Sequence, residues 1–443
     1  MENKKAFGLW SAVLLGIGSM VGAGIFIVIG QAGSIAGNLV WVSFLFGGGA
    51  ALLSGYSLAK LAIAYPSRGG LVEYLVQGYG VGVFSGSAGV LFYFSQLIAI
   101  AAVAKSFGAY AVTLMPLEST HTNLFALGIV ALFILINLIG AALVAKLENV
   151  IVLIKLTVLV GFSGVALFYI DPTLLSVADM PKMSQMFFAI GLTFFAYQGF
   201  SVITNTVEDM QNPQKTMMRA MILAIVLVGL LYVVTSLAVL GNLPLSKVIE
   251  AKDYALAQAA QPIFGAWGFK IMALTALLAT ASAINATLYA ATEIGYTLAK
   301  EGSLPKLYTY NFHQSYSGLL ISGLLIVPMI LFLNLSEITT IAALVVLIIQ
   351  GLTHIGHLFR LEQTGANRWL VLGAVVSMFS IAGLTLYYTS QHTMPHIALY
   401  LIMAFGLAFF VEVSLRLVTK RVIRKQSEKR LFKETSFNLF GLK

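Results

Sequence analysis

Most of this sequence consists of long apolar segments separated by short polar connections, and this pattern restricts the chain to few folds. Of its 443 residues, 59% are hydrophobic and 10% are charged, with a mean hydropathy of +0.92. Soluble domains contain roughly 45–50% apolar and about 25% charged residues, and a helix that spans a bilayer needs about 20 apolar residues. We therefore predict an all-α membrane protein with twelve transmembrane helices, near 7–36, 39–64, 82–114, 122–143, 148–170, 184–206, 217–240, 261–299, 316–334, 337–358, 368–388 and 395–418.

The composition also excludes several other classes of protein. The apolar content excludes intrinsic disorder and collagen-like repeats. The chain has no cysteine, which excludes disulfide frameworks, thiolate zinc sites and cysteine nucleophiles. His354 and His357 near the end of the tenth span are two potential ligands without a third, so no metal site is expected, and we expect them at the cytoplasmic surface.

The distribution of Lys and Arg predicts the orientation in the membrane. With a cytoplasmic N-terminus, 20 of the 26 Lys and Arg residues lie on the inner side, four lie outside and two lie within spans. The positive-inside rule then places both termini in the cytoplasm, and we expect the protein in the plasma membrane. The net charge of +9 includes a basic tail, residues 419–443, that would lie against anionic lipids. Nucleic-acid binding is the weaker interpretation, because no folded basic patch is interleaved with aromatic residues.

The first span contains four glycines within nine residues, at positions 16, 18, 22 and 24. Each glycine costs about 1 kcal/mol of helix propensity relative to alanine, so the cluster favours a break in the helix. Backbone exposed to lipid is not tolerated, so such a break must line a cavity or a bound solute. Close packing of two helices through the Gly18-x-x-x-Gly22 pattern is the competing interpretation. A dinucleotide-binding fingerprint does not fit, since no strand precedes the glycines.

The sixth span is interrupted in a similar way. Polar residues follow Tyr197 within an apolar segment, up to Thr206. Spans 1 and 6 are five helices apart, so the second set of five would enter the membrane in the opposite orientation. Interrupted helices at matching positions of inverted repeats indicate the binding site of a transporter. We therefore expect a first repeat over residues 1–170, a second over 184–360, and two further helices over 368–418.

Several motifs along the chain are similar to those of one transporter family. They are Gly16–Phe26, Phe195–Phe200, Glu208, Asn212-Pro213, Arg219-Ala220, Ser282–Thr287 and Tyr296–Pro305. With these motifs the chain resembles the amino acid–polyamine–organocation (APC) superfamily, and within it the ApcT-type broad-specificity, proton-coupled amino acid transporters. Ala23 differs from relatives that carry serine or threonine there. The resemblance implies a fold like that of LeuT, with a 5+5 inverted repeat and broken helices 1 and 6.

Two broken helices would bind both ends of an amino acid. The N–H groups of Ala23, Gly24 and Ile25 would face the carboxylate at a positive helix end. Free carbonyls that end the two first half-helices would accept hydrogen bonds from the ammonium. No acidic side chain lies near this site in spans 1, 3 or 6, which favours neutral substrates. The predicted substrate-binding residues in the two breaks are Met20, Val21, Gly22, Ala23, Gly24, Ile25, Phe195, Ala196 and Gln198.

The pocket for the substrate side chain is defined less closely by the sequence. Phe195 is a candidate aromatic lid, although aromatic residues also fill membrane cores as simple packing. Two further pairs of polar residues share a helix face, and they are either substrate contacts or interhelical hydrogen bonds. These are Tyr93 with Gln96 in span 3 and Ser282 with Asn285 in span 8.

Lys155 is a charged residue within the apolar fifth span. It lies about 10 Å from Glu148 along a helix. A charge inside the membrane is a candidate functional group, and burial favours the neutral form of a lysine. We predict that Lys155 couples transport to protons by binding, when protonated, to carbonyls around Gly18, a role that the family resemblance also implies. The alternative is that its long side chain reaches the cytoplasmic interface.

The sequence therefore predicts a secondary transporter that imports neutral L-amino acids with protons by alternating access. An exchanger without net proton movement is the alternative. A membrane enzyme or a channel fits less well, because catalytic motifs and repeated filter loops are absent from the sequence. The expected partners are amino acids, protons and the lipid bilayer, including contacts with lipids or sterols, and no cofactor is expected. The oligomeric state is left open.

Overall fold

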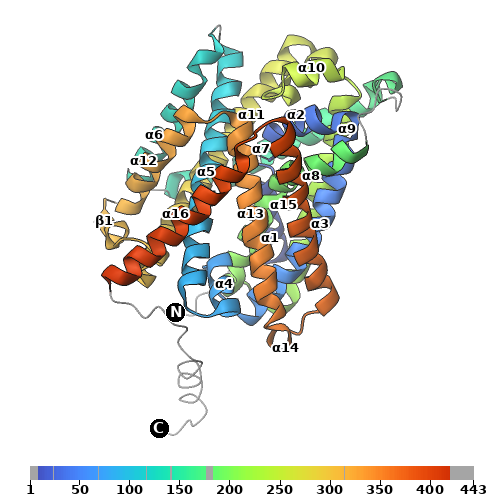
Figure 1. The fold of residues 1–443 in the computed structure, drawn as a ribbon. Coiled ribbons are helices and arrows are strands. Elements are labelled where there is room, and N and C mark those ends of the chain that lie inside the picture. The colour runs from blue at the N-terminus through green and yellow to red at the C-terminus, as the bar shows by residue number, and fades with distance from the viewer. Residues whose placement is uncertain are drawn as a thin grey trace.

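The computed structural model describes residues 8–22, 24–67, 69–115, 117–139, 142–175, 183–313 and 315–419. The helices pack into one bundle, in which outer helices surround inner ones (Figure 1). Its first part contains α1 (Leu9–Met20), α2 (Gly24–Ala36), η1 (Gly37–Leu39), α3 (Val40–Ala64), α4 (Leu71–Tyr79), α5 (Val83–Leu114), η2 (Ser119–His121), α6 (Thr122–Ile139), α7 (Ala142–Ala166), η3 (Leu167–Tyr169) and η4 (Pro172–Leu175).

The second part of the chain continues the bundle and contains a single short hairpin. Its elements are α8 (Met183–Tyr197), η6 (Gln198–Asp209), α9 (Pro213–Leu240), α10 (Leu245–Glu250), α11 (Ala255–Glu301), η7 (Lys306–Thr309), β1 (Asn311–Phe312), β2 (Ser315–Tyr316), α12 (Ser317–Phe332), α13 (Leu335–Leu358), α14 (Leu361–Thr364), α15 (Arg368–His392) and α16 (Ile397–Val418). The strands pair antiparallel, with Asn311 opposite Tyr316.

The structure confirms an all-α, multi-pass membrane protein. Within the described residues, ten helical segments are long and apolar enough to cross a bilayer, and α1 and α12 are shorter apolar helices. Each of the twelve predicted segments overlaps at least one of these helices, and the helical segment Gly24–Ala64 runs across the first two predicted segments. The count of twelve spans and the division into two inverted repeats remain predictions.

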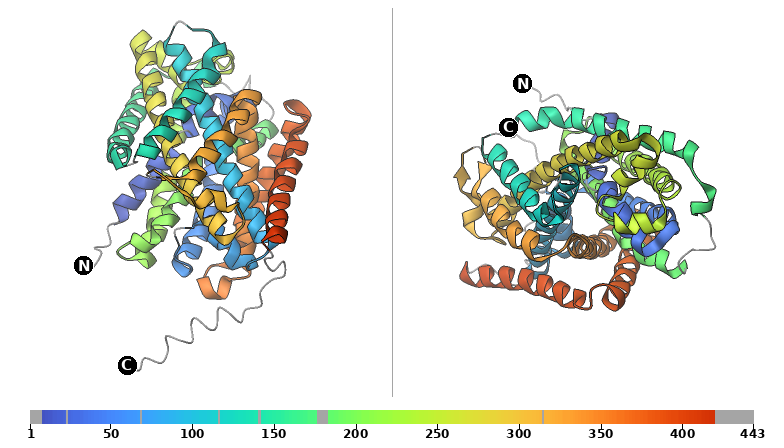
Figure 2. Two further views of the ribbon diagram at one scale, coloured as in Figure 1. Left: turned by 90° about the vertical axis from the view of Figure 1, so that its left-hand side faces the viewer. Right: turned by 90° about the horizontal axis from the view of Figure 1, so that it is seen from above.

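The helices differ in how much of their surface is covered by the protein. The apolar windows of α5 and α13 are mostly buried, whereas those of α6, α7 and α16 mostly expose apolar side chains. Figure 2 shows α16 along one side of the bundle when it is viewed from above. A bilayer accepts such exposed apolar side chains without cost, so α5 and α13 form the core and the outer helices face lipid.

Two ends of the bundle are distinguished by short helices. In Figure 1, α4 and α14 lie at the lower end, and α10 lies at the upper end. The loop after α10 packs tightly on α2, because a Cβ added to Gly30 would lie 2.0 Å from the carbonyl oxygen of Lys252. Below, the two ends are called the α14 face and the α10 face.

Candidate substrate and proton site

The first span is broken where its glycines cluster. Helix α1 ends at Met20, and Val21 and Gly22 form a turn before α2 begins at Gly24. Met20, Val21 and Ile25 are buried, while Ala23 lies outside the described residues. As the first residues of α2, Gly24 and Ile25 have N–H groups with no acceptor within the helix. The break therefore presents the positive end of a helix inside the protein.

The sixth span changes its helix type after Tyr197 without unwinding, and this junction is called the second break below, beside the first break between α1 and α2. Helix α8 ends at Tyr197, and the chain continues directly as the 3₁₀-helix η6, which is 12 residues long. The hydroxyls of Ser201, Thr204 and Thr206 each donate to the carbonyl three residues earlier, at 2.7–3.2 Å. Such local bonds compete with regular α-helix, and a long 3₁₀ segment often marks a functional hinge.

The two breaks lie in direct contact. A Cβ added to Gly24 would lie 2.6 Å from the carbonyl oxygen of Ala196, and one added to Gly199 would lie 2.4 Å from the carbonyl carbon of Ser19. Glycine is required at both positions because only a residue without a side chain permits this approach. The segments that the sequence placed together are therefore neighbours in the fold.

The carbonyls of Met20 and Ala196, near the ends of α1 and α8, each accept a hydrogen bond that the sequence did not predict. The hydroxyl of Tyr232 in α9 lies 2.7 Å from the oxygen of Met20 and 3.1 Å from that of Ala196. Tyr232 is fully buried. The sequence analysis overlooked it, although it is a polar side chain in an apolar stretch of the seventh span. One phenol thus links both broken helices to a third.

Lys155 also contacts the first span. Its side chain is 0% exposed, and Nζ donates a hydrogen bond of 2.7 Å to the carbonyl oxygen of Gly18. A Cβ added to Gly18 would lie 2.8 Å from Cγ2 of Val152, so α7 packs closely on this part of α1. The alternative in which Lys155 extends to the membrane interface does not fit this position.

Phe195 and Gln198 lie at the end of α8 and the start of η6. Phe195 is buried. The Oε1 atom of Gln198 accepts a hydrogen bond of 3.4 Å from Nε2 of Gln350 in α13. Its own Nε2 atom is buried and has no hydrogen-bond partner among the residues that the structure describes. The amide of Gln198 is therefore a donor available to a bound molecule at the second break.

The polar pairs of spans 3 and 8 make contacts between or within helices. Tyr93 bonds to Ser322 of α12 at 2.8 Å, and Gln96 bonds to the neighbouring Ser95 at 3.5 Å. Asn285 accepts a hydrogen bond of 2.7 Å from Asn137. These contacts match the interhelical alternative more closely than a common pocket.

Ser282 brings an acidic side chain that the sequence analysis did not consider. Its hydroxyl donates to Oε1 of Glu148 in α7 at 2.5 Å. Ser282 precedes Ala283, whose Cβ would lie 2.9 Å from a Cβ added to Gly22. A carboxylate from the fifth span therefore lies near the first break, and only the packing of α7 on α11 could reveal it.

The two histidines are not at the surface, and this expectation was wrong. His354 and His357 are both 0% exposed. All four of their ring nitrogens lie within 2.8 Å of a hydroxyl oxygen of Ser54, Ser57 or Thr364. The surrounding helices α3 and α14 supply these hydroxyls.

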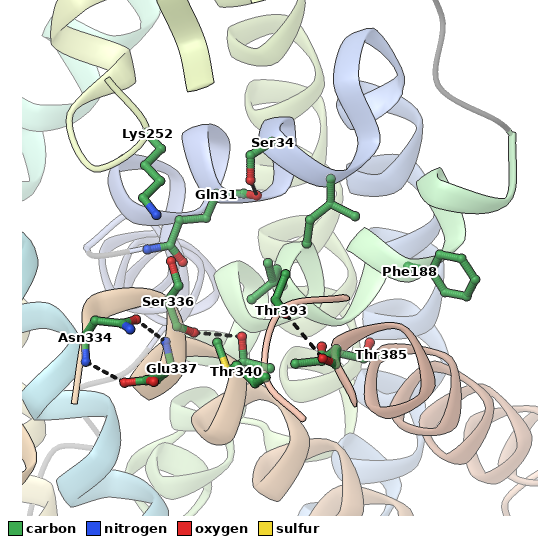
Figure 3. A pocket seen from close by; sticks show the side chains of 14 residues that line it. Gln31, Ser34, Phe188, Lys252, Asn334, Ser336, Glu337, Thr340, Thr385 and Thr393 are labelled. Carbon is green, nitrogen blue, oxygen red and sulfur yellow. Dashed lines mark hydrogen bonds between the residues drawn. The ribbon is translucent and has the colours of Figure 1, made fainter. Parts of the chain in front are cut away.

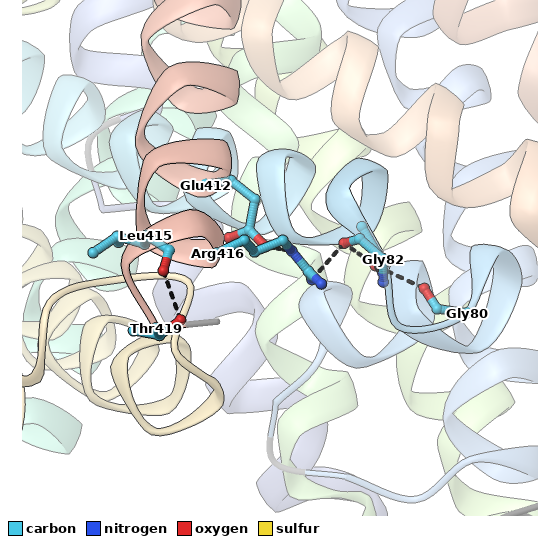
Figure 4. Close-up of polar contacts among 7 residues, drawn as sticks. Gly80, Gly82, Glu412, Leu415, Arg416 and Thr419 are labelled. Atoms are coloured by element: carbon cyan, nitrogen blue, oxygen red, sulfur yellow. Dashed lines mark hydrogen bonds and ion pairs between the residues drawn. The ribbon is translucent and has the colours of Figure 1, made fainter. Parts of the chain in front are cut away.

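Arg416, one of the 20 Lys and Arg residues counted on the inner side, is also buried. Its Nε atom forms an ion pair with Glu412 one turn earlier in α16, and its Nη2 atom donates to the carbonyl of Gly82 at 2.9 Å (Figure 4). The pair fastens the lipid-facing helix α16 to the start of α5.

A pocket of about 230 Å³ is lined by residues of α2, α8, α13 and α15 and by the loop after α10 (Figure 3). Its wall includes Gln31 and Ser34 of α2, Lys252, and Glu337 of α13. Glu337 is already engaged, since it caps the start of α13 by a pair of hydrogen bonds with Asn334. None of the predicted substrate residues that the structure describes belongs to the wall of this pocket.

Comparison with known proteins agrees with this architecture. The sequence model of the amino acid permease family matches residues 7–413. The chain is 37% identical to "Inner membrane transport protein YbaT" of Escherichia coli (strain K12), over 86% of this chain and 90% of the relative. It is 34% identical to "Uncharacterized protein MJ0609" of Methanocaldococcus jannaschii, over 95% and 97% respectively. It is 25% identical to "Serine/threonine exchanger SteT" of Bacillus subtilis (strain 168), over 68% and 70%.

Proposed function

Because the chain belongs to the amino acid permease family, we propose that it imports neutral L-amino acids together with protons by alternating access. Amino acid transport across a membrane is the activity that the family supports. The observation that carries the proton-coupled form is the hydrogen bond from Lys155 Nζ to the carbonyl of Gly18, beside the first break. A buried amine in that position can bind and release one proton per cycle.

The substrate would bind at the two breaks through main-chain groups. The N–H groups that begin α2 would face its carboxylate, by the arrangement common at helix N-termini. The carbonyl oxygens of Met20 and Ala196 would face its ammonium. Each of these oxygens accepts one hydrogen bond from Tyr232, and a carbonyl has two lone pairs, so each oxygen can accept a second hydrogen bond.

The proton would act by changing how firmly α1 is held. A protonated Lys155 fastens α1 to α7 through a charge-assisted hydrogen bond, which is stronger than a neutral one. After the proton leaves, the bond weakens and α1 can move. The α14 face would be cytoplasmic by the positive-inside rule. Import would then move the substrate from the α10 face to the α14 face, with both termini in the cytoplasm.

The test is uptake by the purified protein in proteoliposomes. Each of the twenty labelled amino acids is supplied outside, with and without an inward proton gradient, while a dye reports internal pH. The proposal expects neutral amino acids to accumulate only with the gradient, and the interior to acidify as they enter.

Exchange is the second candidate, and one relative is named "Serine/threonine exchanger SteT". Uptake by an exchanger requires an amino acid inside the vesicle and does not depend on the proton gradient. Uptake that depends on internal amino acid alone, at an unchanged internal pH, would replace symport by exchange.

A further inference from the structure

A continuous line of buried hydroxyl and imidazole groups begins at α14 and runs inward between α3 and α13. It consists of Thr364, His357, Ser57, His354 and Ser54, of which the two serines and two histidines are 0% exposed. The successive distances are 2.8 Å from Thr364 Oγ1 to His357 Nε2, 2.7 Å from His357 Nδ1 to Ser57 Oγ, 2.8 Å from Ser57 Oγ to His354 Nδ1, and 2.8 Å from His354 Nε2 to Ser54 Oγ. We call it the Ser–His line.

The inner end of the Ser–His line reaches the second break. Ser54 donates to Oε1 of Gln350 at 2.8 Å, and Nε2 of Gln350 donates to Oε1 of Gln198 at 3.4 Å. Gln198 begins η6 and precedes Gly199, which contacts Ser19 of the first break. The groups therefore connect the proposed transport site to the α14 face.

The hydrogen bonds of this line all point the same way. Ser54 has one proton and donates it to Gln350, so it accepts from Nε2–H of His354. A neutral imidazole carries one N–H, so Nδ1 of His354 accepts from Ser57. Ser57 then accepts from Nδ1–H of His357, which leaves Nε2 of His357 to accept from Thr364. The Thr364 hydroxyl also lies 3.3 Å from the carbonyl oxygen of Leu361, and its 2.8 Å contact with Nε2 is the shorter of the two. Every donor is directed toward the break.

We propose that the Ser–His line carries the coupled proton between the second break and the α14 face. This inference rests on the proposed function, since it assigns a route to the proton of that symport. Imidazoles suit such a route because one ring nitrogen can accept a proton while the other releases one. Gln350 and Gln198 do not carry the proton; they position the water that delivers it, and Nε2 of Gln198 is available to bind that water.

The transfer is balanced at each group. It starts with every donor directed toward α14. Protonated water at the break gives a proton to Ser54, and Ser54 passes its own to Nε2 of His354. His354 releases its Nδ1 proton to Ser57, and Ser57 passes its own to Nδ1 of His357. His357 releases its Nε2 proton to Thr364, whose hydroxyl proton goes to water at the α14 face.

Each group gains one proton and loses one, so only the direction of the hydrogen bonds changes. The direction seen in the structure is the one left after a proton has moved from the break to the α14 face. Rotation of the hydroxyls and a change of both imidazole tautomers restore the starting direction.

The charged side chains near the α14 end form hydrogen bonds with groups outside the Ser–His line. Lys60 of α3 donates to the carbonyl of Gly365 at 3.2 Å, and Nε of Arg360 donates to the carbonyl of Gln77 at 2.8 Å. On α4, Glu73 accepts from the amide of Gln77 at 2.7 Å. All four ring nitrogens thus keep hydroxyl partners, which a path for protons requires.

The test separates proton-driven uptake from exchange in proteoliposomes. The probe is an equimolar mixture of the twenty ¹⁴C-labelled amino acids. Proton-driven uptake uses empty vesicles with an inward proton gradient, and exchange uses vesicles loaded with the unlabelled mixture plus a protonophore. Ser57→Ala interrupts the line, and His354→Gln keeps hydrogen bonding but cannot relay a proton. Both should lower proton-driven uptake by about tenfold or more, with exchange unchanged.

The controls address folding and position. Ser43→Ala removes a buried hydroxyl of the same helix whose one hydrogen bond among the described residues goes to the carbonyl of Met186, at 2.8 Å. It should leave both activities intact. Ser57→Thr restores a hydroxyl and should recover proton-driven uptake. Full proton-driven uptake in both interrupting variants, or a parallel loss of exchange in both, overturns the route. Wild-type protein without proton-driven uptake would instead contradict the proposed symport.

Discussion

The Nζ atom of Lys155 lies 2.7 Å from the carbonyl oxygen of Gly18, and so joins α7 to α1 just before the first break. Replacement of Lys155 by alanine removes the group proposed to bind the proton. We expect proton-driven uptake to fall by about tenfold or more, because proton transfer by a positioned side chain contributes at least that much. Lys270→Ala, which removes an exposed lysine lying over Trp267, is the control. Wild-type proton-driven uptake in Lys155→Ala would reject this role.

Tyr232→Phe tests the phenol that links the two broken helices. The change leaves two buried carbonyls, of Met20 and Ala196, without that donor, and an unmet buried group costs about 1–3 kcal/mol. We expect a lower melting temperature in detergent. Tyr197→Phe is the matched control, since its buried hydroxyl reaches only the carbonyl of Phe44, at 2.9 Å. An equal fall in melting temperature in both variants would show that the Tyr232 hydroxyl stabilises the protein no more than that of Tyr197.

Gly24→Ala tests the contact between the breaks. The added methyl would lie 2.6 Å from the carbonyl oxygen of Ala196, which is backbone and cannot rotate away. Overpacking of this kind costs about 1–3 kcal/mol, and we expect uptake to be lost as the breaks separate. Gly49→Ala in α3 meets no atom within 4 Å and should keep wild-type uptake. Normal uptake by Gly24→Ala would show that transport does not require close contact between the two breaks.

The buried pair of Glu412 and Arg416 tests how α16 is attached. Arg416→Met leaves a carboxylate in a buried site (Figure 4), and breaking one partner of a buried pair costs about 3–5 kcal/mol. The double variant Glu412→Leu with Arg416→Met removes both charges and should be more stable than the single variant. Thermal melts of the three proteins measure this order, and the reverse order would contradict it.

The carboxyl group of Asp253, on the α10 face, should make the stability of the protein depend on pH. Burial raises the pKa of its carboxyl above the ordinary 3.8, against the lowering effect of Lys252, the Gln31 amide and Lys105. The carboxyl therefore binds its proton more tightly in the folded protein than in the unfolded chain. For this reason the contribution of Asp253 to stability falls as the pH rises above the ordinary pKa of 3.8. Asp253→Asn should therefore gain in melting temperature relative to wild type between about pH 4 and neutral pH.

Asp171→Asn provides a control of opposite sign. Hydrogen bonds from the hydroxyl and N–H of Thr173 lower the pKa of the Asp171 carboxyl. Its contribution to stability is present at neutral pH and is lost as pH falls below the ordinary 3.8. If the melting temperatures of both variants changed in the same direction relative to wild type as pH varies, the pH dependence would not arise from these two carboxyls.

Much of the fold could be predicted because a membrane imposes a local requirement. Every span must be apolar over about 20 residues, so hydropathy indicated each segment, and clustered glycines indicated where α1 would end. Lys155 was noticed for the same reason, since a charge inside an apolar segment is conspicuous in the sequence alone.

The sequence by itself therefore determined the class of protein, the positions of its helices and the break before Gly24. The tertiary structure decided which side chains became partners. Ser57 and His357 are 300 residues apart, and Tyr232 meets Met20 across 212 residues. Hydropathy averages a segment, whereas a hydrogen bond depends on the rotation and depth of two packed helices. For that reason His354 and His357 were expected at the surface, yet their hydroxyl partners keep them buried.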